Sequence, residues 1–178
     1  PDFTAEALHQ VSVFMTEFKI SKFREEKGSE PNDLESRMLG EQVKDELKVN
    51  RYDKKSNTVM LSEAQTYAYN KLISYYTDLY IDKNTDDKFP PVGYIASRQE
   101  VADLSSFFFW GAWVCVTQRP GSNYSYTHNW PFDPDAGNTP TSPVILWSVL
   151  GLLGFVLACG LVLYYIGQYN QLSNKFFK

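Results

Sequence analysis

Apolar side chains in the first two-thirds of the chain recur every three or four residues, the spacing that places them on one face of an α-helix. This pattern predicts four helices, over residues 4–27, 34–48, 62–81 and 97–117. The apolar stripes of the first two helices are Leu8, Val11, Met15 and Phe18, then Leu34, Met38, Leu39, Val43 and Leu47. Helices of this number and length can bury a core, so a mainly α-helical domain is predicted here.

Residues that commonly cap helices stand at the predicted boundaries. They are Thr4 and Gly28 around the first helix, the capping-box pair Ser62 and Gln65, and the capping-box pair Ser97 and Glu100. Between the second and third helices, the turn-like "KKSN" and the alternation around Met60 predict a short β-hairpin. The polar stretch over 82–93 is predicted to be a loop.

The last of these helices contains "FFFWGAWVCV", residues 107–116, which is apolar on nearly every face. A run of about ten residues is too short to cross a bilayer. Two interpretations remain open. The segment is either a central core helix, or Trp110 and Trp113 dock on a large partner surface.

A second apolar run, residues 143–167, contains no charged side chain. At 1.5 Å per residue it is ~37 Å long, enough to cross the ~30 Å hydrocarbon core of a membrane. Ser142 and Pro143 are placed as N-cap and first helical residue. Aromatic residues flank the run, as in the interfacial belts of spanning helices; they are Trp147 at one end and Tyr164, Tyr165 and Tyr169 at the other. Gly154 and Ala158 form a small-xxx-small pair that suits close packing of another helix.

The segment before this run, residues 119–142, is rich in proline and in aromatic residues. Proline stiffens the backbone, and aromatic rings favour the half-hydrated zone of lipid headgroups. We therefore predict a rigid interfacial collar, with Trp130 as an anchor on neighbouring membrane spans.

Charge supports an orientation and excludes one class of partner. Asp133 and Asp135 precede the apolar run, whereas Lys175 and Lys178 follow it, so the positive-inside rule places the C-terminal end in the cytoplasm. The net charge of -4 and the lack of a basic stripe argue against nucleic acid as a partner. Because the chain begins with Pro1 rather than Met, we expect a processed chain or a piece of a longer one.

Residue types that carry chemistry are sparse, and we assign no catalytic, cofactor-binding or metal-binding residue. We interpret His9 as a surface residue and His128 as an interfacial hydrogen-bonding group. Cys115 and Cys159 form no CxxC or CxxCH motif and read as packing residues. The pair Asp133 and Asp135 could bind a cation, but "DPD" alone is a weak signal.

Four segments together resemble one known family. They are "PDFTAE" at the start, "NRYD" at 50–53, "LSSFFFWGAWVCVTQRPG" at 104–121 and "YSYTHNWPFDPDAGNTPT" at 124–141. They are similar to the N-terminal region of quinol-dependent nitric oxide reductases, single-chain members of the haem-copper oxidase superfamily. His128 departs from the resemblance, because Asn is expected there.

The resemblance implies a haem-free, cytochrome c-like helical domain on the outer side of the cytoplasmic membrane, preceded by one membrane helix and followed by another. The division is then 1–118 for the domain, 119–142 for the collar, 143–169 for the transmembrane helix and 170–178 for a cytoplasmic end. The catalytic membrane-helix bundle, with haem and non-haem iron, belongs to later parts of such a protein. There, electrons from membrane quinol reduce NO to N2O, and this segment is structural.

Two alternatives stay open. A nitric oxide dismutase of the same family shares this outer region. A stand-alone membrane-anchored binding or sensor module that has taken over the domain is the second alternative.

Overall fold

The computed structural model describes residues 3–82, 94–134 and 136–176, and the side chains as far as Tyr169. The chain divides into two compact units, residues 1–128 and 129–178. The predicted loop over 82–93 lies outside the described residues from position 83 onward.

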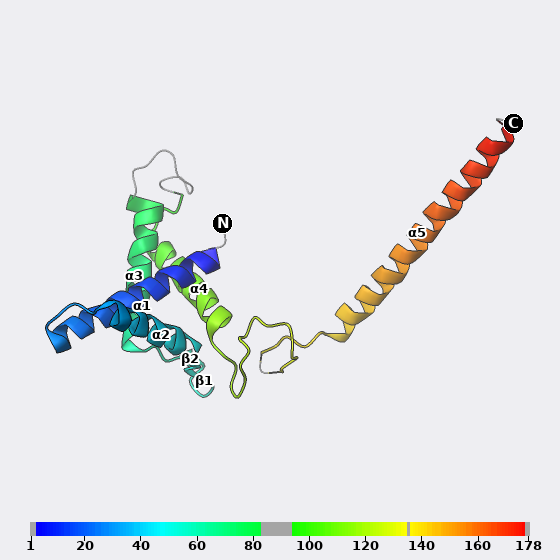
Figure 1. Cartoon of the computed structure of the whole chain (residues 1–178). Helices are drawn as coiled ribbons and strands as arrows, with labels where there is room; N and C mark the ends of the chain where they lie inside the picture. The colour runs from blue at the N-terminus through cyan, green and yellow to red at the C-terminus, as the bar shows by residue number, and fades with distance from the viewer. Residues whose placement is uncertain (1–2, 83–93, 135, 177–178) are drawn as a thin grey trace. The chain divides into compact units, whose positions relative to one another are not determined.

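The described residues of the first unit form four α-helices, one short hairpin and one π-helical turn (Figure 1). The helices are α1 (Phe3–Lys27), α2 (Asp33–Lys48), α3 (Glu63–Thr77) and α4 (Arg98–Val116), with the turn η1 (Asp78–Asp82) after α3. The strands β1 (Tyr52–Asp53) and β2 (Thr58–Val59) pair antiparallel. The predicted helices and hairpin are therefore confirmed, and the third helix reaches Asp82 through a wider last turn.

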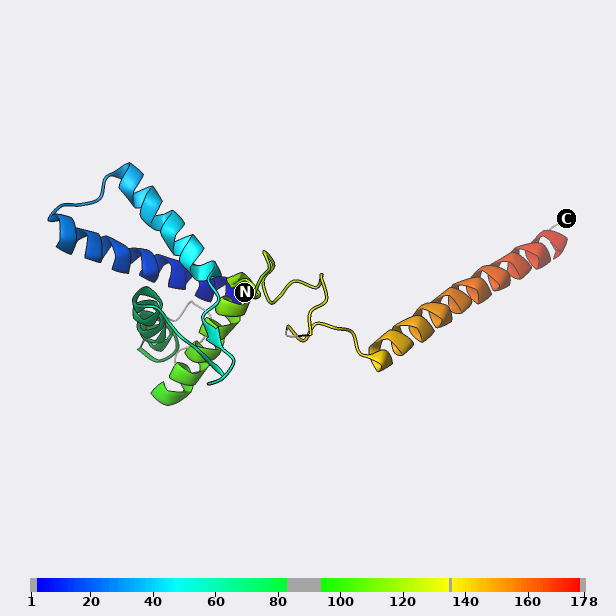
Figure 2. The same ribbon diagram turned by 90° about the horizontal axis from the view of Figure 1, so that it is seen from below.

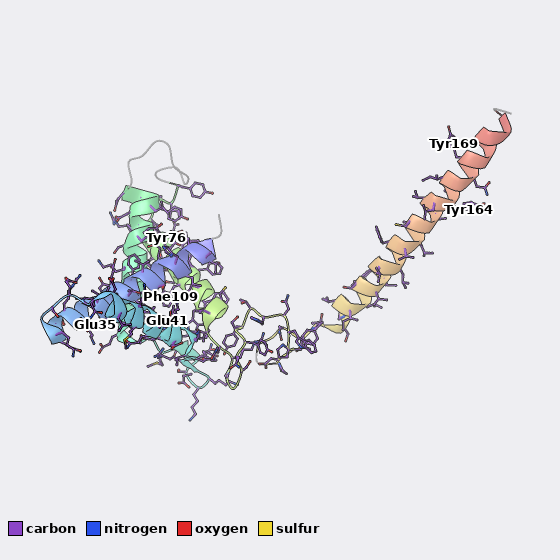
Figure 3. All side chains as sticks on the ribbon, in the orientation of Figure 1. Glu35, Glu41, Tyr76, Phe109, Tyr164 and Tyr169 are labelled. Atoms are coloured by element: carbon purple, nitrogen blue, oxygen red, sulfur yellow. The ribbon has the colours of Figure 1, made fainter. Side chains whose placement is uncertain are left out.

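The core lies where α1, α3 and α4 pack against one another. Figure 3 labels Tyr76 of α3 and Phe109 of α4 in this part of the unit. Tyr76 is fully buried, with its ring centre 5.1 Å from that of Phe108. The buried apolar residues are Ala7, Val11, Met15, Val43, Leu47, Ala64, Ala68, Leu72, Tyr76, Tyr80, Val101 and Ala112.

The predicted stripe of α1 is confirmed, but that of α2 is only half right. Val43 and Leu47 are buried, whereas Leu34 and Met38 are exposed. Figure 2 shows the reason: α1 and α2 converge at the C-terminal end of α2 and diverge toward the connection between them. Among the described elements, the N-terminal half of α2 therefore has no helix close enough to bury Leu34 and Met38.

The helix caps show where the sequence pattern holds and where it does not. Gly28 ends α1 with φ +68°, and its N–H donates to the Arg24 carbonyl at 2.9 Å, a left-handed C-terminal cap. The capping box of Ser62 and Gln65 is present. At α4, Ser97 accepts instead from the N–H of Gln99, two residues on, so the predicted pairing with Glu100 is wrong. Thr4 lies inside α1 and does not cap it.

The second unit contains α5 (Ser142–Phe176). Its stretch Ser142–Tyr169 is long and apolar enough to cross a membrane. Tyr164 and Tyr169 project from the sides of this helix in Figure 3. The helix begins at Ser142, one residue before the predicted start, because the Thr141 carbonyl accepts the first helical hydrogen bond, from Ile145, at 3.1 Å.

Candidate functional site

Several polar contacts gather in the segment after α4, residues 118–128, which we name the Arg119 loop. The Arg119 side chain is only 2% exposed. Its Nε donates to the carbonyl of Ser125 at 2.9 Å, and its Nη2 donates to the carbonyls of His128 and, at 3.5 Å, Tyr126. A guanidinium is a planar group of five donors, so it can hold several carbonyls at fixed positions. The side chain thus closes the loop around itself.

Backbone and side-chain contacts attach this loop to the C-terminal end of α2. The N–H of Gln118 donates to the Lys48 carbonyl at 3.0 Å, and the Thr117 hydroxyl donates to the Leu47 carbonyl at 3.0 Å. Asn50 Nδ2 lies 3.0 Å from the Gln118 carbonyl and 2.7 Å from the Tyr126 hydroxyl. The first half of the predicted collar is therefore fixed to the helical domain.

A stacked pair of aromatic rings also connects the loop to the core. The buried Trp113 of α4 lies against Tyr126 of the loop, with ring centres 5.5 Å apart and planes at 27°. For Trp113, the interpretation as a core residue is thus confirmed.

The opposite face of α4 is different. Phe107 is 60% exposed and Trp110 is 54% exposed, with ring centres 6.0 Å apart. The two interpretations of "FFFWGAWVCV" therefore apply to different faces of α4. The face of Trp113 belongs to the core, and the exposed face of Phe107 and Trp110 is free for a docking role.

The second half of the collar belongs to the second unit. Trp130 is 68% exposed and meets Phe132 edge to face, with ring centres 5.0 Å apart. Asn138 organises the turn: its Oδ1 accepts from the N–H of Asp133 at 2.8 Å, and its Nδ2 donates to the Pro131 carbonyl at 3.3 Å. The anchoring role of Trp130 stays a prediction.

The residues that could carry chemistry are scattered. His9 is exposed on α1, and Cys115 is half-buried on α4. His128 lies in the Arg119 loop, its Nδ1 3.4 Å from the Ser125 hydroxyl and its ring near Tyr124. Cys159 is exposed on α5, and Asp135 lies outside the described residues. Within the described ranges, no three His, Cys, Asp or Glu residues are grouped so that they could hold a metal ion.

Titratable groups serve to tie helices together. Burial alone would raise the pKa of Glu46, but hydrogen bonds from Lys19 of α1 and Ser62 at the start of α3 outweigh it and hold the pKa below its ordinary value. The Lys19 Nζ lies 2.8 Å from the carboxylate. Burial, and after it the hydrogen bond to Glu6, raise the pKa of Tyr75 to about 12, so this phenol stays a donor.

Sequence reasoning missed the roles of Arg119 and Asn50. One signal for Arg119 was available: it is the sole charged residue between Asp103 and Asp133. A lone charge among apolar and aromatic residues is typically satisfied inside the fold. Asn50 gave no comparable signal, because its partners lie in a segment about seventy residues later.

Comparison with known proteins agrees with this architecture. Residues 1–132 match the family model of the NorB cytochrome c-like domain of nitric oxide reductase. The helical unit is thus a cytochrome c-like domain, followed by a helix that could span a membrane. The chain belongs to the NorB family of nitric oxide reductases, which are oxidoreductases. No curated protein matches the chain significantly.

Proposed function

We propose that the chain is the outer, structural part of a respiratory membrane nitric oxide reductase that takes its electrons from quinol. The family match over residues 1–132 carries this proposal. In it, the domain lies on the outer side of the cytoplasmic membrane, α5 anchors it, and the catalytic membrane-helix bundle belongs to other parts of the protein.

The absence of covalent haem is part of the proposal. A haem of the c type needs a CxxCH motif, and the sequence has Cys115 and Cys159 alone, neither in such a motif. Aromatic rings fill the centre of the described domain. The ring centres of Tyr75, Tyr80 and Phe108 lie 5.1 to 6.0 Å from that of Tyr76. A haem does not fit there, because these side chains occupy the space.

The choice of electron donor is part of the same proposal. A domain without haem cannot itself pass electrons from a soluble cytochrome to the membrane, which favours a donor that is reached within the membrane. Quinol is the membrane-soluble donor that meets this condition. Haem and non-haem iron held by the rest of the enzyme supply the chemistry that joins two NO molecules into N2O. The residues of this chain bind none of the metals and shape the outer face.

The test uses the full-length protein, purified and reconstituted in lipid. We expect NO consumption with a reduced quinol and formation of N2O, followed by mass spectrometry, and no turnover with reduced cytochrome c as the control donor. Haem staining after denaturing electrophoresis should show no covalently bound haem.

Other results would point elsewhere. Release of N2 and O2 identifies a dismutase, and no NO consumption favours a membrane-anchored binding or sensor module. A covalent haem band on the polypeptide would overturn the structural role of the domain.

A further inference from the structure

The outer face of α4 changes from polar to apolar along its length. At its N-terminal end, Gln99 donates to Asp103 at 3.0 Å, and both are exposed. One and two turns further on, Phe107 and Trp110 occupy the same face and are also exposed. The neighbouring face is covered by α3, where Tyr69 bonds to Ser106 and contacts Phe109. The exposed rings therefore lie on one face of the middle of α4.

The surroundings of these two rings set them apart from other exposed apolar residues. No charged residue occurs from Leu104 to Gln118, and the next charge, Arg119, is buried in its loop. On α2, by contrast, Met38 has 56% exposure but stands on a helix dense in charge, with Glu35, Arg37 and Glu41 nearby in sequence. Met38 thus has charged residues on both sides of it in sequence, whereas the exposed stretch of Phe107 and Trp110 has a charged neighbour on one side alone, Asp103, one turn before Phe107.

The size of the patch indicates the kind of partner. From typical aromatic areas, the exposed parts of the two rings amount to roughly 250 Å². A stable protein interface buries about 800 Å² on each partner. Two rings are too small for that. They suit insertion into a fluid layer, and Trp in particular favours the lipid headgroup zone.

The chain also continues from this end of α4 toward a helix able to cross a membrane. The Arg119 loop follows α4 directly, and the connection up to α5 carries Trp130 and Phe132, both exposed. Exposed aromatic residues thus recur from Phe107 onward through the part of the sequence that approaches the bilayer.

We propose that Phe107 and Trp110 insert into the headgroup layer of the membrane that α5 crosses, giving the domain a second membrane contact. The inference rests on α5 crossing the membrane, which is part of the proposed function. It adds that the face of α4 with Phe107 and Trp110 contacts lipid rather than water or protein.

The test places a nitroxide spin label at single positions of the full-length protein in phosphatidylcholine nanodiscs. All native cysteines, Cys115 and Cys159 among them, are first replaced by Ala, and labels are attached through Phe107→Cys, Trp110→Cys, Met38→Cys or Leu157→Cys. Collision with oxygen, which concentrates in lipid, is compared with collision with a water-soluble nickel chelate. Met38 is the matched control, because its exposure equals that of Trp110 within a few percent.

We expect the ratio of oxygen to nickel collisions to be highest at position 157, lowest at position 38 and intermediate at positions 107 and 110, because both reagents reach the headgroup layer. A ratio at 107 and 110 equal to that at 38 would place these residues in water, and low access to both reagents would place them against protein; either result overturns the inference. If position 157 is also open to nickel, α5 does not cross the membrane and the proposed anchoring itself fails.

A second measurement needs no label. Fluorescence quenching by brominated phosphatidylcholine should fall when Trp110→Phe removes one lipid-facing indole. The control Trp113→Phe removes a buried indole in the same helix and should leave the fluorescence intensity that is lost to quenching unchanged. Equal quenching in Trp110→Phe and in the unsubstituted protein would overturn the inference.

Discussion

Arg119 illustrates how one residue can hold a long loop in a defined shape. A charged group removed from water is costly unless its hydrogen bonds are replaced. Here the carbonyls of Ser125, Tyr126 and His128 replace the lost water, and all three lie within the loop that the guanidinium closes. The buried guanidinium thus holds the loop together, instead of being solvated at the surface.

The first prediction concerns this centre. Arg119→Lys keeps the charge, but a single ammonium nitrogen cannot reproduce contacts made from two separate nitrogens. Because hydrogen bonds to charged groups contribute about 1.5–3 kcal/mol, we expect the free energy of unfolding to fall by about that amount. Denaturant unfolding of the protein in detergent, followed by circular dichroism, measures the change.

Arg98→Lys is the matched control. Arg98 makes an ion pair with Asp82 at 2.9 Å, but its side chain is largely exposed. Exposed pairs contribute about 0–1 kcal/mol. Equal losses for Arg119→Lys and Arg98→Lys would show that the buried guanidinium has no special role.

At the scale of elements, Glu46 joins three helices. It stands on α2, pairs with Lys19 of α1, and accepts from Ser62, which caps α3. Its carboxylate also lies near Arg51 at the hairpin. Packing of apolar faces brings the helices together, and this group fixes their ends.

The second prediction concerns acid. The pKa of Glu46 in the folded domain is lower than its ordinary value of 4.5, so its contribution to stability is fully present above that value. The contribution is lost as pH falls from 4.5 through the lowered folded pKa. We expect the melting temperature of Glu46→Gln to depend less on pH in this window, with a loss of about 1–2 kcal/mol near neutral pH.

Glu41→Gln serves as the control, since Glu41 is exposed and pairs with Lys44 on the same helix. It should leave the pH profile of the melting temperature unchanged. If Glu46→Gln also leaves that profile unchanged, the three-helix link does not contribute to acid stability.

The elements also show what the sequence can and cannot predict. Repeats of apolar residues placed all four helices of the domain, because burial of one face is a local periodic property. Leu34 and Met38 were misassigned because the repeat does not show where a neighbouring helix ends. The widened turn of η1 and the Arg119 loop have no local signature, since their partners are set by the packing of distant segments.

On the scale of the whole molecule, the candidate site was also predictable from the sequence only in part. The resemblance of "LSSFFFWGAWVCVTQRPG" to nitric oxide reductases predicted the family, which the match over residues 1–132 confirms. The two faces of α4 could not be separated in advance, because both carry aromatic residues. Only the packing of Trp113 on Tyr126 distinguishes the buried face from the face of Trp110.

The third prediction concerns membrane orientation. Acidic residues precede the apolar helix and lysines follow it, so we expect Ser29 outside and Lys178 in the cytoplasm. A fluorescent protein that matures in the cytoplasm should be active when placed after Lys178. Alkaline phosphatase, which needs export, should be active when inserted at Ser29. The opposite pattern of activities would reverse the orientation.

The way in which Arg119 holds its loop affects which side chains of the loop can change. The contacts described for the guanidinium are with main-chain carbonyls, which every amino acid provides. A substitution at the exposed position 128 therefore leaves its acceptor in place while changing what the loop presents outside, whereas Ser125 is buried and the Tyr126 ring packs on Trp113. His128, where the resemblance leads us to expect Asn, is one such exchange. Evolutionary drift, or a library of engineered variants, can thus alter the chemistry of this loop while its backbone shape is inherited unchanged.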